Sequence, residues 1–360
     1  MAEAELTERA VHAARPVIEV GGRPEPLVQG LLRAMAMREA EGGLASLELR
    51  LGGTATIEGR GVDLAFEDGS VLALGAGLKV LAGDERDPVE IFRGTISALE
   101  FVVEAGGEPE LLVQAEDALM RERLRRATRL HAGGPLRDLV EDMAVAMGLR
   151  PVIQGLEVEV DAQLQLAESN LGFLRRLLAD HDADLQIVGD ELHVTARARA
   201  RRGEVTLALG SQLQRVHVIA DLAHQASRVT LAAADVAQGR TLTATSSVST
   251  LGPGRGRTGA ELLEATMGEI PHHLAGRQVA GLGEAQALVD AAMARRARRF
   301  VTVQATATGN PLIRVGTHVA LEGLGPRFAN TYYVTAATHR FDLAEGYVTE
   351  LAAECAYLGG

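Results

Sequence analysis

An internal repeat limits the possible folds strongly: two strand-rich stretches, about 239 residues apart, carry matching patterns. The four matching pairs are Gly77-Leu78-Lys79-Val80 with Gly316-Thr317-His318-Val319, Phe92-Arg93-Gly94-Thr95-Ile96 with Tyr332-Tyr333-Val334-Thr335-Ala336, Phe101 with Phe341, and Leu111 to Glu116 with Thr349 to Glu354. Because short apolar strands resemble one another easily, one match alone would have little weight. Four matches in the same order, with nearly equal spacers, favour duplication of one unit.

Both copies of the repeat change phase within one strand. Ile96 and Ala98 point to one face before Leu99 and Phe101 point to the other, and the second copy changes in the same way. A phase change inside a strand indicates a bulge or a sharp bend, which is the device that closes small barrels. The sequence therefore predicts two similar small antiparallel β-barrels, one in each copy.

Helical signals occupy the chain between the copies, and 360 residues are enough for two or three domains. Helical spacing follows Pro135, and a second helix is predicted to begin at a Ser169-Asn170 cap, before a hairpin at Gly189-Asp190. The predicted regions are an N-terminal arm (1–14), a first β-barrel (15–116), an α+β middle domain (117–202), a second β-barrel (203–356) with a helical insertion at about 241–299, and a C-terminal tail (357–360). We therefore expect a mainly β chain in which two barrels flank an α+β domain.

Overall charge and cysteine content narrow the function. The formal net charge is −12, so the chain lacks the electrostatic attraction of a dedicated nucleic-acid binder. The single cysteine, Cys355, allows neither an intrachain disulfide nor a cysteine-built zinc site. The acidic start, Met1 to Glu5, differs from a signal peptide, and no stretch approaches the roughly 18 apolar residues of a membrane helix. We expect a soluble chain made in the cytoplasm, without specific nucleic-acid binding or stable membrane insertion.

The order of the predicted elements resembles the phage late-control D family and the N-terminal hub part of VgrG proteins from type VI secretion. Four stretches are similar, and the resemblance covers about residues 15 to 356. They are Pro16 to Gly22; Ile91 to Ile96 leading into Leu112 to Asp117; Glu168 to Leu177; and Gly309-Asn310-Pro311 with Val315-Gly316, Tyr333-Val334 and His339. The order and spacing of all four, rather than any single motif, identify the family.

The resemblance implies a structural baseplate hub of a contractile phage tail or contractile injection system, assembled in the bacterial cytoplasm and carried in the baseplate. In that family three subunits form a ring of six barrels, which adapts a hexameric inner tube to a trimeric spike. VgrG proteins continue into further domains that end in a β-helical spike, whereas this sequence stops at Gly360. The expected partners are therefore two further copies of the chain, the inner tube protein, a spike on a separate chain, and baseplate wedge or tube-initiator proteins.

Three polar stretches contain residue types that bind metals or phosphate, and each has a simpler interpretation. His181-Asp182-Ala183-Asp184 lies at a predicted helix end, where a solvated turn is favoured over a metal site. His272-His273 has no third ligand at zinc-site spacing. Gly252 to Thr258 departs from phosphate-loop spacing, with Arg257 where the second glycine belongs, and is interpreted as a flexible loop.

The remaining candidates also favour structural roles. His339 is matched by Leu99 in the first copy, so packing is favoured over catalysis. Arg295 to Arg299 complement the dipole at a helix C-terminus, and Ser169 lacks the flanking glycines of a nucleophile elbow. The sequence therefore predicts no catalytic, cofactor-binding or metal-binding residues and no enzymatic activity. Two alternatives stay open: a tail-tip cell-wall hydrolase and a carbohydrate-binding double-barrel protein.

Overall fold

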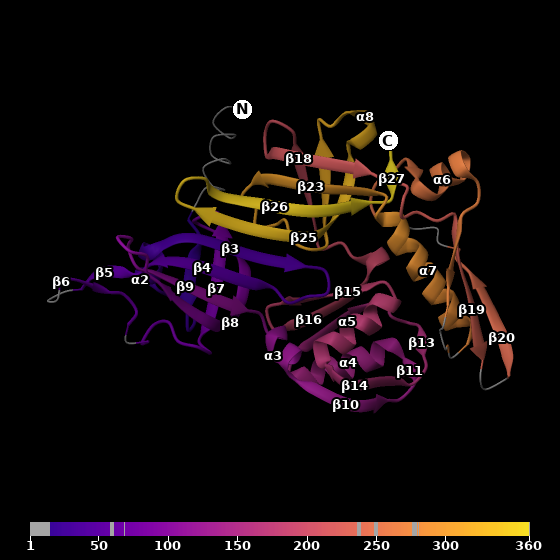
Figure 1. Cartoon of the computed structure of the whole chain (residues 1–360), viewed down its shortest axis with the longest axis horizontal. Coiled ribbons are helices and arrows are strands. Elements are labelled where there is room, and N and C mark those ends of the chain that lie inside the picture. Colours follow the sequence, from indigo (N-terminus) through magenta and orange to yellow (C-terminus); the bar gives the residue numbers. More distant parts are fainter. Residues whose placement is uncertain are drawn as a thin grey trace.

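The computed structural model of the chain describes residues 15–57, 61–67, 69–235, 239–247, 251–275, 279 and 281–359. The predicted N-terminal arm, residues 1–14, lies outside these ranges. In Figure 1 the first strand-rich half lies at the left, the second at the top, the middle region at the bottom and the insertion at the right.

Strands dominate both ends of the chain, and helices gather in the middle region and the insertion. The first half contains β1 (Val17–Val20), β2 (Arg23–Pro24), α2 (Pro26–Leu31), β3 (Leu32–Ala40), β4 (Ser46–Gly52), β5 (Thr54–Ile57), β6 (Gly61–Leu64), β7 (Gly77–Gly83), β8 (Pro88–Val102) and β9 (Glu110–Glu116). The middle region contains α3 (Leu119–Leu124), β10 (Arg126–His131), β11 (Gly134–Pro135), α4 (Leu136–Met147), β12 (Arg150–Gln154), β13 (Glu159–Val160), β14 (Gln163–Ser169), α5 (Asn170–Asp180), β15 (Ala183–Val188), β16 (Glu191–Ala196) and the 3-10 helix η1 (Arg197–Arg199). The second half contains β17 (Gly203–Ala208), β18 (Leu213–Ala220), β19 (Arg228–Asp235), β20 (Arg240–Thr245), β21 (Arg257–Thr258), α6 (Gly259–Met267), β22 (Pro271–Leu274), α7 (Leu282–Arg298), β23 (Val301–Thr308), β24 (Thr317–Glu322), α8 (Gly325–Phe328), β25 (Asn330–Asp342), β26 (Gly346–Cys355) and β27 (Tyr357–Leu358).

Thirteen strands from both halves form one sheet. Its order is β18-β23-β26-β25-β3-β4-β9-β8-β7-β1-β2, with β24 beside β25 and β17 beside β24. The halves meet where β3 pairs with the second part of β25. The edge of β3 that does not pair with β4 is therefore hydrogen-bonded to a strand of the other half. The mainly β class with an α+β region is confirmed, whereas no closed barrel is detected among the described strands.

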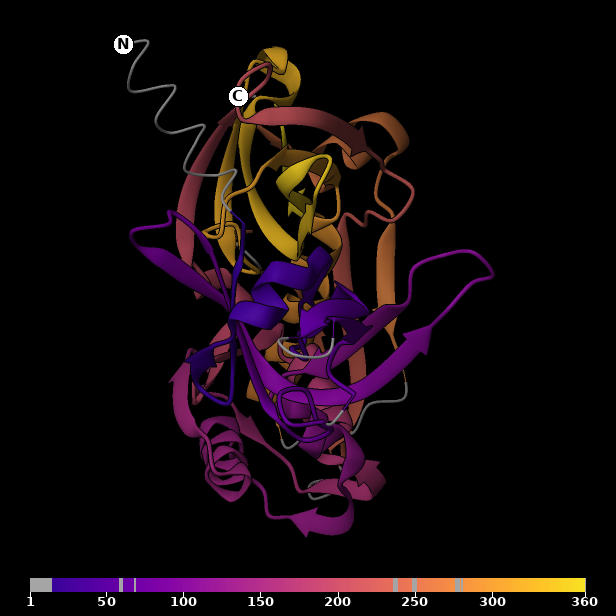
Figure 2. The same ribbon diagram turned by 90° about the vertical axis from the view of Figure 1, so that its left-hand side faces the viewer.

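Each half has the same order of strands. In the first half the order is β1-β7-β8-β9-β4-β3, and in the second it is β17-β24-β25-β26-β23-β18. Only the outermost strand differs, since β1 is antiparallel to β7 whereas β17 is parallel to β24. The hairpin that joins β8 to β9 projects from the body of the molecule (Figure 2). The repeated order agrees with the duplication predicted from the sequence.

A pair of glycines shows that one predicted match is displaced by two residues. Gly75 and Gly316 both have a left-handed backbone, with φ of 86° and 91°. The N–H of Gly75 donates to the carbonyl of Ile96, and the N–H of Gly316 donates to that of Val334, both at 2.9 Å. Gly75 therefore takes the place of Gly316, and the predicted match of Gly316 with Gly77 is wrong.

The same displacement occurs in the long strands β8 and β25. Thr95 lies opposite Glu116, and Tyr333 lies opposite Glu354, so Thr95 corresponds to Tyr333 and not to Thr335. The predicted equivalence of Glu116 with Glu354 is confirmed by the same pairs. Because side chains alternate along a strand, a shift of two residues leaves each one on its face. The hydrophobic pattern therefore could not reveal the displacement.

The predicted bends are present at equivalent positions. The register of β8 against β9 shifts at Ser97, and that of β25 against β26 shifts at Thr335. The Ser97 hydroxyl donates to the carbonyl of Gln114, and the Thr335 hydroxyl donates to that of Ala352, both at 3.2 Å. An extra residue at a bulge disrupts the ladder locally, and here its hydroxyl supplies a bond to the facing strand in both copies.

The helix cap at Ser169 and the hairpin predicted in the middle region are both present. The Ser169 side chain accepts a hydrogen bond of 3.0 Å from the N–H of Gly172 and caps α5, and α4 ends at the left-handed Gly148. Antiparallel β15 and β16 form the predicted hairpin, and β12 adds to β16 in parallel. The helices pack on this sheet through an apolar core that includes Leu139, Leu174 and Val194.

The insertion is not purely helical, in contrast to the prediction for residues 241–299. Strand β20 lies largely within the predicted helical insertion, and β19, β20 and β22 form a small sheet beside α7. The alternation of Thr and apolar residues at Thr241 to Thr245 explains the strand, since Leu242 and Ala244 point into a core with α7. Residues 248–250 lie outside the described ranges. Within those ranges no helix is both long and apolar enough to cross a membrane.

Candidate functional site

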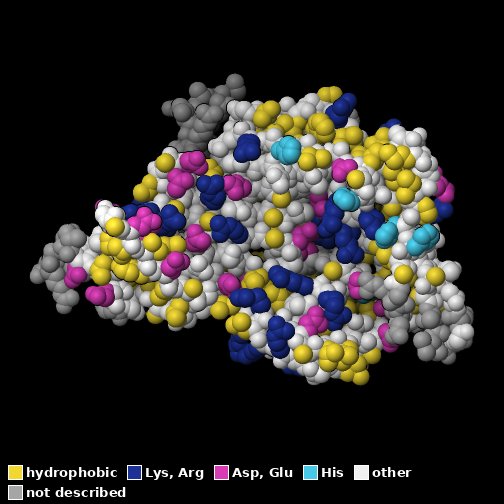
Figure 3. All heavy atoms as spheres, in the orientation of Figure 1, with side chains coloured by type: hydrophobic (Ala, Val, Ile, Leu, Met, Phe, Trp, Pro, Cys, Tyr) yellow, Lys and Arg dark blue, Asp and Glu magenta, His cyan; other side chains and the backbone are white. Residues whose placement is uncertain are grey.

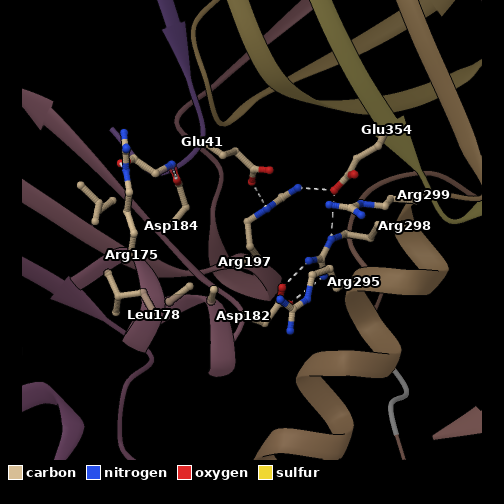
Figure 4. Close-up of a pocket in the computed structure, with 14 residues that line it drawn as sticks. Glu41, Arg175, Leu178, Asp182, Asp184, Arg197, Arg295, Arg298, Arg299 and Glu354 are labelled. Atoms are coloured by element: carbon tan, nitrogen blue, oxygen red, sulfur yellow. Dashed lines mark hydrogen bonds and ion pairs between the residues drawn. The ribbon is translucent and has the colours of Figure 1, made fainter. Parts of the chain in front are cut away.

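Five charged residues meet where both halves of the sheet contact the middle region. We call this cluster the junction. It consists of Glu41 after β3, Asp182 after α5, Arg197 in η1, Arg298 at the end of α7 and Glu354 in β26. They line a pocket together with further arginines (Figure 4). Basic side chains gather near the centre of the face of the molecule that Figure 3 shows.

Arg197 lies at the centre of the junction. Its side chain is about 4% exposed and forms ion pairs with Glu41 and Glu354. The guanidinium carbon also lies 3.3 Å from the centre of the Tyr333 ring, which is a cation–π contact. Burial alone would raise the free energy of a lone guanidinium strongly, so these partners are what allow an arginine here. Arg197 therefore connects the middle region to strands from both halves.

Arg298 joins the insertion to the same cluster. Its Nη1 lies 2.8 Å from Asp182 Oδ2, and its Nε lies 3.2 Å from Glu354 Oε1. Burial alone would lower the pKa of Arg298, but the carboxylates of Asp182 and Glu354 outweigh it and raise that pKa above its ordinary value. Arg298 therefore stays charged, and the end of α7 is fixed against α5 and β26.

The turn between β3 and β4 is held by the middle region. The Arg175 guanidinium donates to the carbonyls of Gly42 and Gly43, both at 2.7 Å, and Asp184 accepts from the N–H of Gly42 at 2.7 Å. A Cβ on Gly43 would lie 2.6 Å from the side chains of Leu119 and Leu185. The turn therefore fits the middle region only with glycine at this position.

A second buried polar cluster lies on the seam between β3 and β25. Glu39 in β3 accepts from Arg314 Nη2 at 2.5 Å and from the N–H of Val315 at 2.7 Å. Burial would raise the pKa of Glu39, but the charge of Arg314 and these two hydrogen bonds together lower it below its ordinary value. The seam therefore contains an ionised carboxylate whose partners come from the other half of the chain.

His339 is buried in the same seam. Its Nδ1 and the Tyr347 hydroxyl share a hydrogen bond of 2.7 Å, and burial followed by the nearby charge of Arg314 lowers the pKa of His339 to about 4. Strand pairing makes Phe101 its equivalent in the first copy, rather than Leu99 as the sequence suggested. The equivalent residue is apolar in either alignment, which agrees with the predicted packing role.

The predicted turn at His181 to Asp184 is not a solvated loop, and its Asp182 belongs to the junction. Asp184 is buried and also accepts from Arg202 at 2.9 Å, so both aspartates of this stretch bind arginines. His272 Nε2 lies 2.7 Å from Arg296 Nη2, and the side chains of His273 and Thr230 share a hydrogen bond of 2.5 Å. In the described part of the chain no group of three His, Cys, Asp or Glu residues is placed to hold a metal ion.

The remaining candidates are placed as follows. Thr258, at the end of the glycine-rich loop, caps α6 in a capping box with Glu261. Arg295 to Arg299 end α7 as predicted, but Arg298 forms buried ion pairs in addition to its position at the helix terminus. Among the candidates, Ser169 and Thr258 cap helices, His339 is buried in the seam, and Asp182 and Arg298 belong to the junction.

No motif or spacing in the sequence indicates a functional role for these five residues: Glu39, Glu41, Arg197, Arg314 and Glu354. One signal was available, because Glu39 shares a strand face with the apolar Met35 and Met37, and a carboxylate on a buried face requires a partner. That partner, Arg314, is 275 residues away, and sequence spacing does not indicate it.

Comparison with solved structures identifies the fold. The 43 kDa tail protein of prophage MuSo2 from Shewanella oneidensis has a TM-score of 0.68 at 14% identity, covering 95% of this chain and 98% of that one. The tail protein from Neisseria meningitidis MC58 has a TM-score of 0.63 at 13% identity, covering 94% and 96%. An E. coli type VI secretion component, described as similar to the T4 tail proteins gp27 and gp5, has a TM-score of 0.61 at 12% identity, covering 95% and 78%. The predicted resemblance to phage tail hub proteins is confirmed at the level of the fold.

Sequence comparison gives the family. No curated protein matches the chain. The family model described as the Alg8 N-terminal domain matches residues 58–342, which is well over half of the sequence. The chain belongs to the Alg8 N-terminal domain family.

Proposed function

We propose that the chain is a structural hub of a contractile phage tail or contractile injection system and carries out no catalytic step. Three copies would form a ring. The observation that supports this most directly is the repeated strand order, because each chain contains two units of the same topology. Three chains with two such units each present six similar surfaces, which is what a threefold assembly needs to contact a sixfold one.

The mechanism in this proposal is geometric. One face of the ring would meet a hexameric inner tube, and the other would meet a trimeric spike on a separate chain, leaving a passage along the axis. Such a part must keep its two units at a fixed angle while the tail contracts. The seam of β3 with β25 joins the two halves to each other, and the ion pairs of the junction join both halves to the middle region, which supports such rigidity.

The first test is the native mass of the full chain by light scattering over a range of concentrations. One chain has a mass of 38.0 kDa, so a trimer has a mass of about 114 kDa. We expect the trimer either alone or after co-expression with a trimeric spike, and averaged electron micrographs of it should show six similar lobes. A chain that remains monomeric in both preparations would contradict the proposal.

A further inference from the structure

Several strand edges of the sheet lack a strand partner among the described residues, including those of β2 and β17, and two others are related to the seam. One is the outer edge of β18, which ends the sheet and pairs only with β23. The other is the second part of β8, because β7 pairs only with the first part, up to Thr95. Open edges invite pairing with another chain, so soluble proteins usually cover or block them.

The two open edges are equivalents of the two edges that form the seam. β18 occupies the same place in the second half as β3 in the first, and the register of each shifts at its start, between Leu213 and Arg215 and between Leu32 and Ala34. The second part of β8 occupies the place of the second part of β25. Within the chain, therefore, the edges of β3 and β25 are paired with each other, whereas the equivalent edges of β18 and β8 have no partner.

The exposed fractions of apolar side chains on the β8 edge agree with a missing partner strand. Leu99, Phe101 and Val103 are 37%, 55% and 56% exposed. Their equivalents on the joined edge, Ala337, His339 and Phe341, are 1%, 0% and 6% exposed. Leu99 and Phe101 lie in β8 and Val103 directly follows it. A row of three large apolar side chains along such an open edge marks a protein-binding edge rather than an ordinary surface.

We propose that β18 of one chain pairs antiparallel with the second part of β8 of another copy, repeating between chains the seam that β3 and β25 form within one. The register follows from the seam, in which Ala336 lies opposite Ala40 and Asp342 opposite Ala34. The opposing residues in the proposed pairing are Ala98 with Asp221, Leu99 with Ala220, Phe101 with Val218, Val103 with Val216, and Glu104 with Arg215.

The side chains brought together by this register are complementary. Phe101 and Val103 meet Val218 and Val216, which are only partly buried in the single chain. At the end of the pairing Glu104 faces Arg215, so opposite charges meet where both are exposed. The contact joins two different edges and is therefore heterologous, which generates a ring when the rotation closes and a filament when it does not. That this ring closes after three chains rests on the proposed function, whereas the pairing itself does not.

The pairing is tested by cysteine cross-linking of the full chain. In the double variant Glu104→Cys with Arg215→Cys we expect disulfides between chains on mild oxidation, and a 1:1 mixture of the two single variants should give a covalent dimer and nothing larger. The matched control is Asp342→Cys with Ala34→Cys, the equivalent pair in the seam, which should close within one chain. Glu104→Cys with His217→Cys, displaced by two residues or roughly 7 Å, should cross-link far less. The native Cys355 is buried and does not interfere.

A second variant tests the energetics of the edge. Phe101→Asp should raise the chain concentration needed for assembly by at least about tenfold, since a charge would enter an apolar contact. Leu130→Asp, at a 72% exposed apolar residue of the middle region, should leave assembly unchanged. A chain that assembles while only the seam control forms its disulfide would overturn the pairing and leave the hub proposal intact. Cross-linked chains that grow into open filaments would support the pairing and contradict the hub, and a monomer without cross-links would contradict both.

Discussion

At the scale of single residues, the molecule places its charges where parts distant in sequence meet. Arg197 and Arg199 lie two positions apart in one 3-10 helix, yet their side chains are about 4% and 61% exposed. A buried charge that loses its partner costs far more than an exposed one, because water cannot replace the lost interaction. The two arginines therefore form a matched pair for measuring what the junction contributes.

We expect Arg197→Ala to lower the free energy of unfolding by about 3 kcal/mol, because Glu41 and Glu354 lose a buried partner. Arg199→Ala removes only the exposed pair with Glu157 and should cost less than about 1 kcal/mol. Urea unfolding of both variants measures the difference. Equal losses would mean that the junction adds nothing beyond a surface ion pair.

His339 should make the chain sensitive to acid. Its pKa of about 4 in the folded chain lies below the ordinary value of 6.5, so between these values the unfolded chain binds a proton that the folded chain does not. Stability should therefore fall by roughly 3 kcal/mol as the pH falls from 6.5 to 4, for this group alone. His339→Gln should show a shallower fall over that range in unfolding free energies measured at several pH values, and parallel curves would contradict the assignment.

At the scale of elements, the equivalent bulges in β8 and β25 show how a strand bends without losing its partner. The extra residue at each bulge, Ser97 or Thr335, uses its hydroxyl to bond the facing strand. Both positions carry a hydroxyl although the two strands differ in most other side chains. The hydrogen bond, rather than side-chain packing, is the feature that the two bends share.

We expect Thr335→Val to cost about 1 kcal/mol, since the variant keeps the shape and loses the hydrogen bond to the carbonyl of Ala352. Thr338→Val is the control on the same strand, because its hydroxyl makes no hydrogen bond to the described residues. Thermal unfolding of both variants measures the effect. A loss of the same size at Thr338 would point to the general cost of valine in β25 instead.

At the scale of the whole molecule, the two halves share one core across the seam. Phe341 and Tyr347 of the second half pack among core residues of the first, such as Met37 and Leu49. A sheet that runs through both halves makes them one cooperative unit, because opening the seam exposes apolar surface on each side. The open strand edges of β8 and β18 are equivalent to the edges of β25 and β3 that form this seam, but they have no partner within the chain.

Phe341→Ala should therefore cost about 3 to 5 kcal/mol and loosen both halves together. Hydrogen exchange should show faster exchange of β3 and β4 as well as β25 and β26. Phe101→Ala, at a 55% exposed residue, should leave the stability of the monomer within about 1 kcal/mol of the wild type. Exchange that rises only in β25 and β26 would mean that the halves open independently.

The mainly β class, the N-cap of α5, the duplication and the presence of a bend in each copy are predictable from the sequence, because they depend on local periodicity and on residues close in the chain. Local periodicity could not determine the alignment of the repeat to better than two residues, since strand faces recur with that period. The pairing of β3 with β25, the contact of Glu39 with Arg314 and the burial of Arg197 and Arg298 exist only in the folded chain. Most of these contacts join residues that are more than a hundred positions apart, and their stability depends on burial, which exists only once the chain has folded.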